Sequence, residues 1–141
     1  MKFASIFAAA MLATTPTAVL ACEARQPENF SGFFNRFAED KNFAASRTVY
    51  PSLRIRYDYG LEGGKQQITE SRRTVSRQGD VASQTMGHFI QTNQLEYTTS
   101  GISKDKVVVD VLKPGRDWVL SYHFLSKGGC WFLREIQYHA L

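Results

Sequence analysis

The stretch that decides the fold is FSGFFNRF, residues 30–37, in which four phenylalanines fall at positions i, i+3, i+4 and i+7. This spacing places Phe30, Phe33, Phe34 and Phe37 on one face of an α-helix, with polar residues covering much of the rest. A helix face this aromatic needs a wide, flat apolar surface to bury it, and a β-sheet supplies one. We therefore expect the helix to pack on a sheet.

A second short helix is predicted directly after the first. Asp40 is suited to cap a helix over residues 41–47 that turns Phe43 inward, and Pro51 ends it. Both predicted helices lie within residues 28–48. Because helices come first and strands afterwards, the order is typical of an α+β domain.

The rest of the chain has the character of strands joined by turns. Residues 53–59 alternate apolar and charged side chains, and glycine-rich residues 60–64 predict a turn into a shorter strand around 66–69. Residues 69–85 are polar and fit either a short helix or an edge strand. Short turns between the last three strands predict an antiparallel meander. The later strands are expected near 94–99 and over 106–112, 117–126 and 130–138.

Motifs at both ends of the domain resemble one group of proteins. Residues 33–37 (FFNRF) run into Ser46-Arg47 and Tyr50-Pro51, and residues 128–136 (GGCWFLREI) resemble a final strand of the form G-x-W-x-L-x-x-I. These motifs resemble small exported bacterial proteins of unknown function with a nuclear-transport-factor-2-like, cone-shaped fold. The resemblance implies two N-terminal helices packed on a curved antiparallel sheet. That fold serves isomerases, dehydratases, carriers and inhibitors, so it does not fix a function.

The first 21 residues predict a secretory signal peptide. Lys2 is followed by an apolar run, residues 3–12, which is too short to span a bilayer, and Val19 and Ala21 suit the pockets of a signal peptidase. Removing 21 of the 141 residues leaves about 120, the size of one domain, which we place at residues 22–141. We expect a periplasmic or secreted protein.

Cys22, the first residue after the predicted cleavage site, has two interpretations. The chain has two cysteines, and in an oxidising compartment Cys22 and Cys130 favour a disulfide. The alternative is a lipid anchor on Cys22, because residues 19–22 loosely match a lipobox. Against the anchor, Val19 stands where leucine dominates. A membrane association is expected only if Cys22 is lipidated.

The charge of the chain points away from nucleic acid. The net charge is +4, and the basic residues are scattered rather than gathered in a stripe with aromatic side chains. The tightest group is Arg72, Arg73 and Arg77, which is the best candidate for a recognition surface because arginines on loops bind carboxylates. The alternative is a solvated basic face. The partner is expected to be a protein or a small anionic ligand.

Candidate catalytic chemistry is sparse. The three histidines form none of the spacings HxH or HExxH, so no metal site and no cofactor are expected. If the face of the sheet that carries His123 lines the cone, His123 has Asp110 on the neighbouring strand as an acid–base partner. The alternative is a histidine with a purely structural place in the sheet.

Two functions therefore remain open. The first is an exported binding module of the cell envelope, of unknown ligand, including a protein-binding, inhibitor or immunity-type role. The second is a small isomerase- or hydrolase-like enzyme that uses a residue pair inside the cone. The enzyme needs both residues in a deep pocket, whereas the binding module needs an accessible surface.

Export is directly testable. Cells that make the full chain should hold a processed protein outside the cytoplasm, because residues 1–21 are expected to be cleaved. Fractionation followed by N-terminal sequencing should find Cys22 as the first residue. A soluble cytoplasmic protein that keeps Met1 would contradict the prediction.

Overall fold

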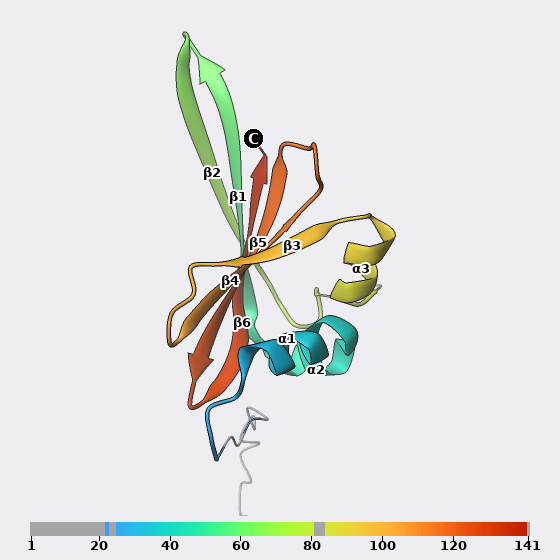
Figure 1. The fold of residues 1–141 in the computed structure, drawn as a ribbon. Coiled ribbons are helices and arrows are strands. Elements are labelled where there is room, and N and C mark those ends of the chain that lie inside the picture. The colour runs from blue at the N-terminus through green and yellow to red at the C-terminus, as the bar shows by residue number, and fades with distance from the viewer. Residues whose placement is uncertain (1–21, 23–24, 81–83, 141) are drawn as a thin grey trace, which may run out of the picture.

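The structure, a computed structural model, describes residues 22, 25–80 and 84–140; the predicted signal peptide lies outside these ranges. Within them the chain forms helices and one six-stranded sheet (Figure 1). The elements are α1 (Phe30–Glu39), α2 (Lys41–Ser46), β1 (Thr48–Glu62), β2 (Lys65–Val75), α3 (Met86–Thr92), β3 (Glu96–Ser100), β4 (Lys106–Leu112), β5 (Trp118–Lys127) and β6 (Cys130–Ala140).

The sheet confirms the predicted α+β class. Its strand order is β2-β1-β6-β5-β4-β3, and the last three strands form the predicted antiparallel meander. One pair departs from an all-antiparallel sheet, because β1 and β6 run parallel. The last strand therefore lies inside the sheet, between the first strand and β5.

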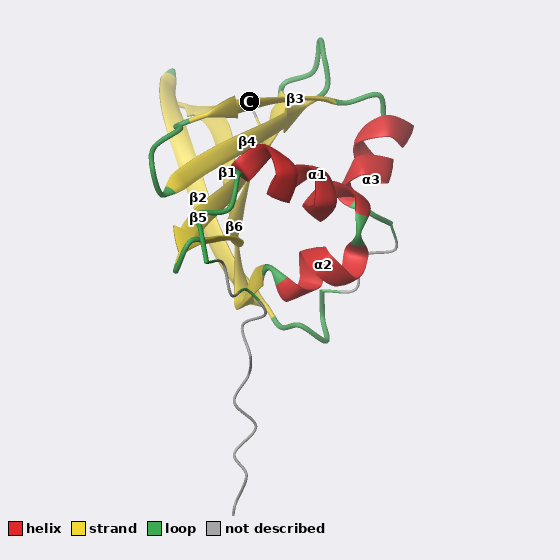
Figure 2. Cartoon of the chain, turned by 60° about the horizontal axis from the view of Figure 1, so that its bottom comes forward, coloured by secondary structure: helices red, strands yellow, loops and turns green. Residues whose placement is uncertain are grey.

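The two predicted N-terminal helices are confirmed, and each begins at a polar cap. The side chain of Asn29 accepts a hydrogen bond from the Gly32 amide (3.1 Å), and Asp40 accepts one from the Phe43 amide (3.0 Å). Both caps satisfy backbone donors that a helix leaves free at its first turn. Figure 2 shows the helices gathered together on one side of the sheet.

The aromatic face of α1 closes around one ring of the sheet. Phe124 on β5 is 1% exposed. Its ring centroid lies 5.2–6.0 Å from the rings of all four α1 phenylalanines, mostly edge to face: Phe30, Phe33, Phe34 and Phe37. This edge-to-face geometry adds to the gain from burying the rings. The spacing in residues 30–37 thus predicted the centre of the core.

A buried ion pair fastens the segment before α1 to the last strand. Arg47, 5% exposed, donates to both carboxylate oxygens of Glu28 (2.9 and 3.3 Å) and to the carbonyl of Trp131 (3.1 Å). Glu28 in turn accepts from the Trp131 amide (3.0 Å), and its own carbonyl accepts from the indole N–H (2.9 Å). The lead segment, α2 and β6 are therefore held by one network.

The predicted disulfide is confirmed. Cys22 and Cys130 are bonded, with their Cα atoms 6.1 Å apart. The bridge lies beside the Glu28 network, where the Glu28 amide donates to the carbonyl of Gly129 (2.8 Å). Two independent links therefore join the start of the described chain to the beginning of β6.

The region between β1 and β3 differs from the sequence-based expectation. The turn is tighter than residues 60–64, since only Gly63 and Gly64 form it, both with positive φ (57° and 77°). The strand expected at 66–69 extends over Lys65–Val75, and α3 was not predicted. Nearly all of β2 is exposed, so burial imposes no alternation on its sequence.

Removing the Phe124 ring should unfold much of the core. We expect Phe124→Ala to lower the free energy of unfolding by about 3–5 kcal/mol, because the cavity would lie between four rings that cannot all collapse into it. Leu61→Ala is the matched control, because Leu61 is 81% exposed and its loss should change stability by less than about 0.5 kcal/mol. Urea unfolding of both variants measures the difference; a loss below that of the control would contradict the packing.

Candidate functional site

Alternation along the strands divides the sheet into two faces. We call the face that carries Phe124 and packs on the helices the inner face, and the opposite one the outer face. On the inner face, Tyr122 and Leu120 follow Phe124 along β5, and the register places Ile136 of β6 opposite Tyr122. The same register continues into β1, where Arg54 lies level with Ile136.

The inner face is not completely covered by the helices. A cavity of about 440 Å³ lies between the sheet and the helical side. Its floor includes Leu120, Tyr122 and Ile136, and α3 adds Met86 and Phe89 to its wall. These side chains make the cavity mainly apolar.

A second hollow, of about 640 Å³, follows the same face toward the β1–β2 hairpin. We call it the arginine trough, because four arginines line it together with Tyr138: Arg54, Arg56, Arg72 and Arg73. It shares its floor with the apolar cavity, since both are lined by Arg54, Leu120, Tyr122 and Ile136. The two hollows therefore form one continuous cleft with an apolar end and a cationic end.

Three of the four arginines that line the trough have their side chains on the inner face, and these three differ in their partners. Arg54 pairs with Asp80, at 3.2 Å to each carboxylate oxygen. Arg56 donates from Nε to Asp58 (2.9 Å) and lies over the Tyr138 ring at 5.0 Å. Arg73 faces Arg54 across the β1–β2 pair and makes no ion pair with any carboxylate of the described residues. Its guanidinium keeps donors for an anion.

Asp80 lines the apolar cavity beside Arg54. The hydroxyl of Tyr50 donates to Asp80 (2.8 Å), and the pKa of Tyr50 is raised by burial and by that hydrogen bond. Asp80 also accepts from Arg54, so its carboxylate holds two side chains of the cleft in place. Burial likewise raises the pKa of Tyr122, although the charge of Arg54 acts in the opposite direction.

The structure separates the predicted arginine group. Arg72 points to the outer face and pairs with Glu70. Arg73, the next residue, lines the trough. Arg77 lies over the Tyr50 ring at 5.1 Å. Arg72 and Arg73 thus both border the trough, but only Arg73 has its side chain on the inner face.

The predicted pair of His123 and Asp110 is not formed, and this is a correction. Both residues lie on the outer face, away from the cone, because each alternates with inner-face residues such as Phe124 and Val109. Asp110 accepts from Ser121 (2.5 Å) and Ser100 (2.7 Å). His123 instead has Glu135 as its nearest carboxylate, at 3.9 Å. This geometry places neither His123 nor Asp110 inside the cone.

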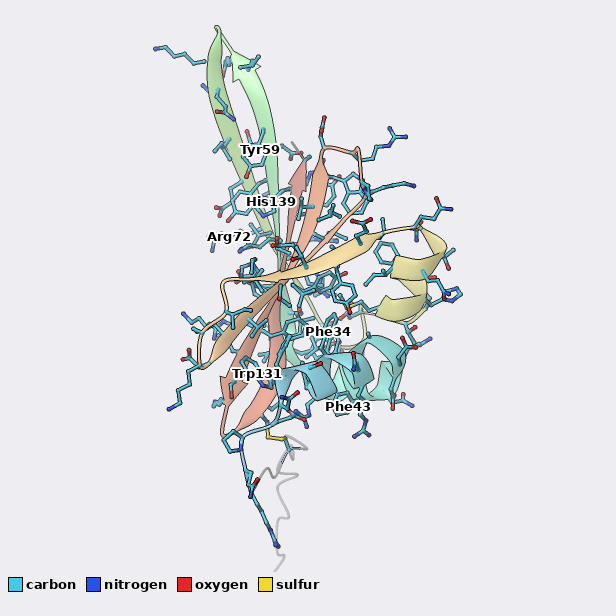
Figure 3. All side chains as sticks on the ribbon, viewed as in Figure 1. Phe34, Phe43, Tyr59, Arg72, Trp131 and His139 are labelled. Carbon is cyan, nitrogen blue, oxygen red and sulfur yellow. A yellow bond between two sulfur atoms is a disulfide. The ribbon has the colours of Figure 1, made fainter. Side chains whose placement is uncertain are left out.

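Another outer-face group surrounds His139. Its Nδ1 lies 3.0 Å from the Tyr59 hydroxyl, and its ring stacks on Tyr57 at 4.9 Å. Figure 3 shows Tyr59 and His139 close together, well away from Phe34 and Phe43 of the helices. Burial lowers the pKa of His139, and Asp110 opposes that shift.

The sequence did not predict that Arg54, Arg56 and the apolar wall would line a cleft. The two arginines alternate with apolar residues on β1, a pattern that usually marks a solvent face. Here that polar face is the inner one, because α1 and α2 cover only the part of the sheet around Phe124. The signal that could have revealed the trough is the pairing of Arg73 with Arg54. That pairing follows only once the register of the β1–β2 hairpin is known.

Among residues 22, 25–80 and 84–140, no three His, Cys, Asp or Glu side chains gather in a way that would hold a metal ion. In the same part of the chain, no helix is long and apolar enough to cross a membrane.

The fold and its half-covered sheet define a cone-shaped α+β protein. No protein-family profile matches the chain, and no curated protein matches it in sequence. A solved NTF2-like protein from Bacteroides fragilis superimposes with a TM-score of 0.53, at 16% identity, over 84% of this chain and 50% of that one. An NTF2-like protein of unknown function from Silicibacter pomeroyi is 11% identical, with a TM-score of 0.35 over 77% of this chain and 90% of that one.

The protein thus has the nuclear-transport-factor-2-like fold that its terminal motifs suggested. The chain spans about half the length of the Bacteroides protein. Since the sequence identity is low, the structural likeness establishes the fold but not the function. The cleft is the feature from which a function can be proposed.

The outer face yields a prediction about protonation. The pKa of His139 should lie below its ordinary value of 6.5, because burial disfavours the charged ring. Asp110→Asn should lower it further, because the Asp110 carboxylate raises it. NMR titration of the imidazole measures both midpoints. The unfolded chain binds the proton more readily, so His139 weakens the fold as the pH falls through 6.5. A higher midpoint in Asp110→Asn would contradict the coupling.

Proposed function

We propose that the protein is an exported, non-enzymatic binding module of the cell envelope that holds a small anionic ligand with an apolar body in its cleft. The observation that carries the proposal is the continuity of the apolar cavity with the arginine trough through a shared floor. A ligand of this kind buries its body between Phe89 and Leu120 and extends its acidic group toward Arg73.

The charges of the cleft support an anion. Arg54 and Arg56 are each balanced by an aspartate, so Arg73 supplies the unbalanced positive charge of the trough. Arginine binds carboxylates and phosphates through two parallel N–H donors, and nearby tyrosine rings shield such a contact from water. Arg73 lies opposite Arg54, and their mutual repulsion falls when an anion lies between them.

The size of the cleft favours a small molecule over a protein segment. Ligand pockets of about 300–1,000 Å³ are typical for small molecules, and both hollows fall in that range, at about 440 and 640 Å³. The lining follows the same pattern, with an apolar majority and a few polar groups that fix orientation. Export would place this site where it meets envelope or extracellular solutes.

Binding can be tested with the anionic dye anilinonaphthalene sulfonate. We expect the dye to fluoresce on binding and decanoate to displace it, while decyltrimethylammonium does not. Arg73→Gln should weaken decanoate binding about tenfold or more, because a charge-assisted hydrogen bond is lost.

Lys65→Gln is the matched control. It removes the same charge from the same strand, but Lys65 is an exposed residue beside the hairpin turn and lines neither hollow. Its affinity for decanoate should equal that of the unmodified protein. Equal losses in both variants, or no loss in Arg73→Gln, would refute the placement of the acidic group.

A further inference from the structure

The edge of the sheet formed by β2 is long and open. β2 is the outermost strand, it has eleven residues, and ten of them are exposed. It pairs with β1 over its whole length without a register shift. In Figure 1 the β1–β2 hairpin extends away from the helices, so its free edge is accessible from the side.

The tight turn determines which backbone groups of β2 point outward. Glu62 and Lys65 flank the two-residue turn and form its hydrogen-bonded pair. Hydrogen-bonded and non-hydrogen-bonded pairs then alternate along an antiparallel ladder. The backbone N–H and C=O groups of every second residue therefore face away from β1: Gln66, Ile68, Glu70, Arg72 and Thr74.

Charged side chains are the one usual edge-protecting feature on β2, which includes Lys65, Glu70 and Arg72. It contains no proline and no bulge, and it is far longer than the other edge strand, β3, which has five residues. Ile68 adds a side chain that is 59% exposed. A regular edge of this length is a template for another strand whose charges complement its own.

The charges of β2 select one way of pairing with itself. When two copies of β2 pair antiparallel about a two-fold axis, the residues whose backbone groups face away from β1 pair with the same kind of residue in the other copy. The axis then passes beside one residue position, which is the same in both copies. With Ser71 on the axis, Glu70 of each copy faces Arg72 of the other, and Ile68 faces Thr74. With Glu70 on the axis two glutamates meet, and with Arg72 there two arginines meet. Opposite charges across a strand pair stabilise it, and like charges weaken it.

We propose that two copies of this protein associate through β2, antiparallel and centred on Ser71, so that their sheets join into one. Each copy supplies the same surface, as a two-fold interface requires. Glu70 and Arg72 already form an ion pair within one chain, and on pairing each Glu70 lies between its own Arg72 and that of the second copy. Arg73 lies within the paired stretch, but the register places its side chain on the inner face, opposite to Glu70 and Arg72, so the pairing does not use the group proposed to bind the ligand.

Single and mixed charge reversals test the pairing. The full chain is expressed, and the processed protein is studied by sedimentation velocity over a wide concentration range. We expect a reversible dimer. Glu70→Arg and Arg72→Glu should each raise its dissociation constant by about tenfold or more, because like charges then face each other across the axis. An equimolar mixture of the two variants should regain dimers.

Two controls keep the result interpretable. Lys65→Glu makes the same charge change beyond the overlapping residues and should leave the dissociation constant unchanged. The double variant E70R/R72E should dimerise as the unmodified protein does, which excludes loss of folding as the cause. A monomer at every concentration, a dimer insensitive to the single reversals, or a mixture that stays monomeric would each overturn the proposal.

Discussion

The packing of α1 around Phe124 is the constraint on which the rest of the structure depends. One helix face supplies four rings to a single ring of β5, and this contact sets where the helices lie on the sheet. Because α1 occupies the Phe124 end of the inner face, the other end stays open. The cleft is therefore a consequence of where the aromatic residues are, and its floor is the continuation of the strands that hold the core.

The features predicted from sequence are those in which burial repeats with a fixed period. Such periods predicted the helix of residues 30–37 and the meander of the last strands. The cap at Asp40 was predicted from its residue type, and the disulfide from the presence of two cysteines. β2 was predicted only in part, as a strand at 66–69, and α3 was not predicted, because neither has a fully buried residue to mark it. Local periodicity carries little information about such elements.

The site depends on which face each side chain takes, and this is where sequence analysis was weakest. Arg72 and Arg73 are neighbours in the sequence, yet their side chains lie on opposite faces of the sheet. His123 and Asp110 share a face as expected, but it is the outer one. Since side chains alternate along a strand, an error of one residue moves a candidate to the opposite side of the molecule. Only the complete register settles that choice.

The place of β6 in the sheet has a consequence for how the chain reaches its fold. β6 is the last strand along the sequence, yet it lies between β1 and β5. Until residues 130–140 have been synthesised, the β1–β2 hairpin has nothing to join it to the meander, and Glu28 and Arg47 lack their contacts with Trp131. Contacts that span so much of the sequence form late, after a large loss of chain entropy. The hairpin, the lead segment and the meander therefore form their joint contacts only after the last strand has been synthesised.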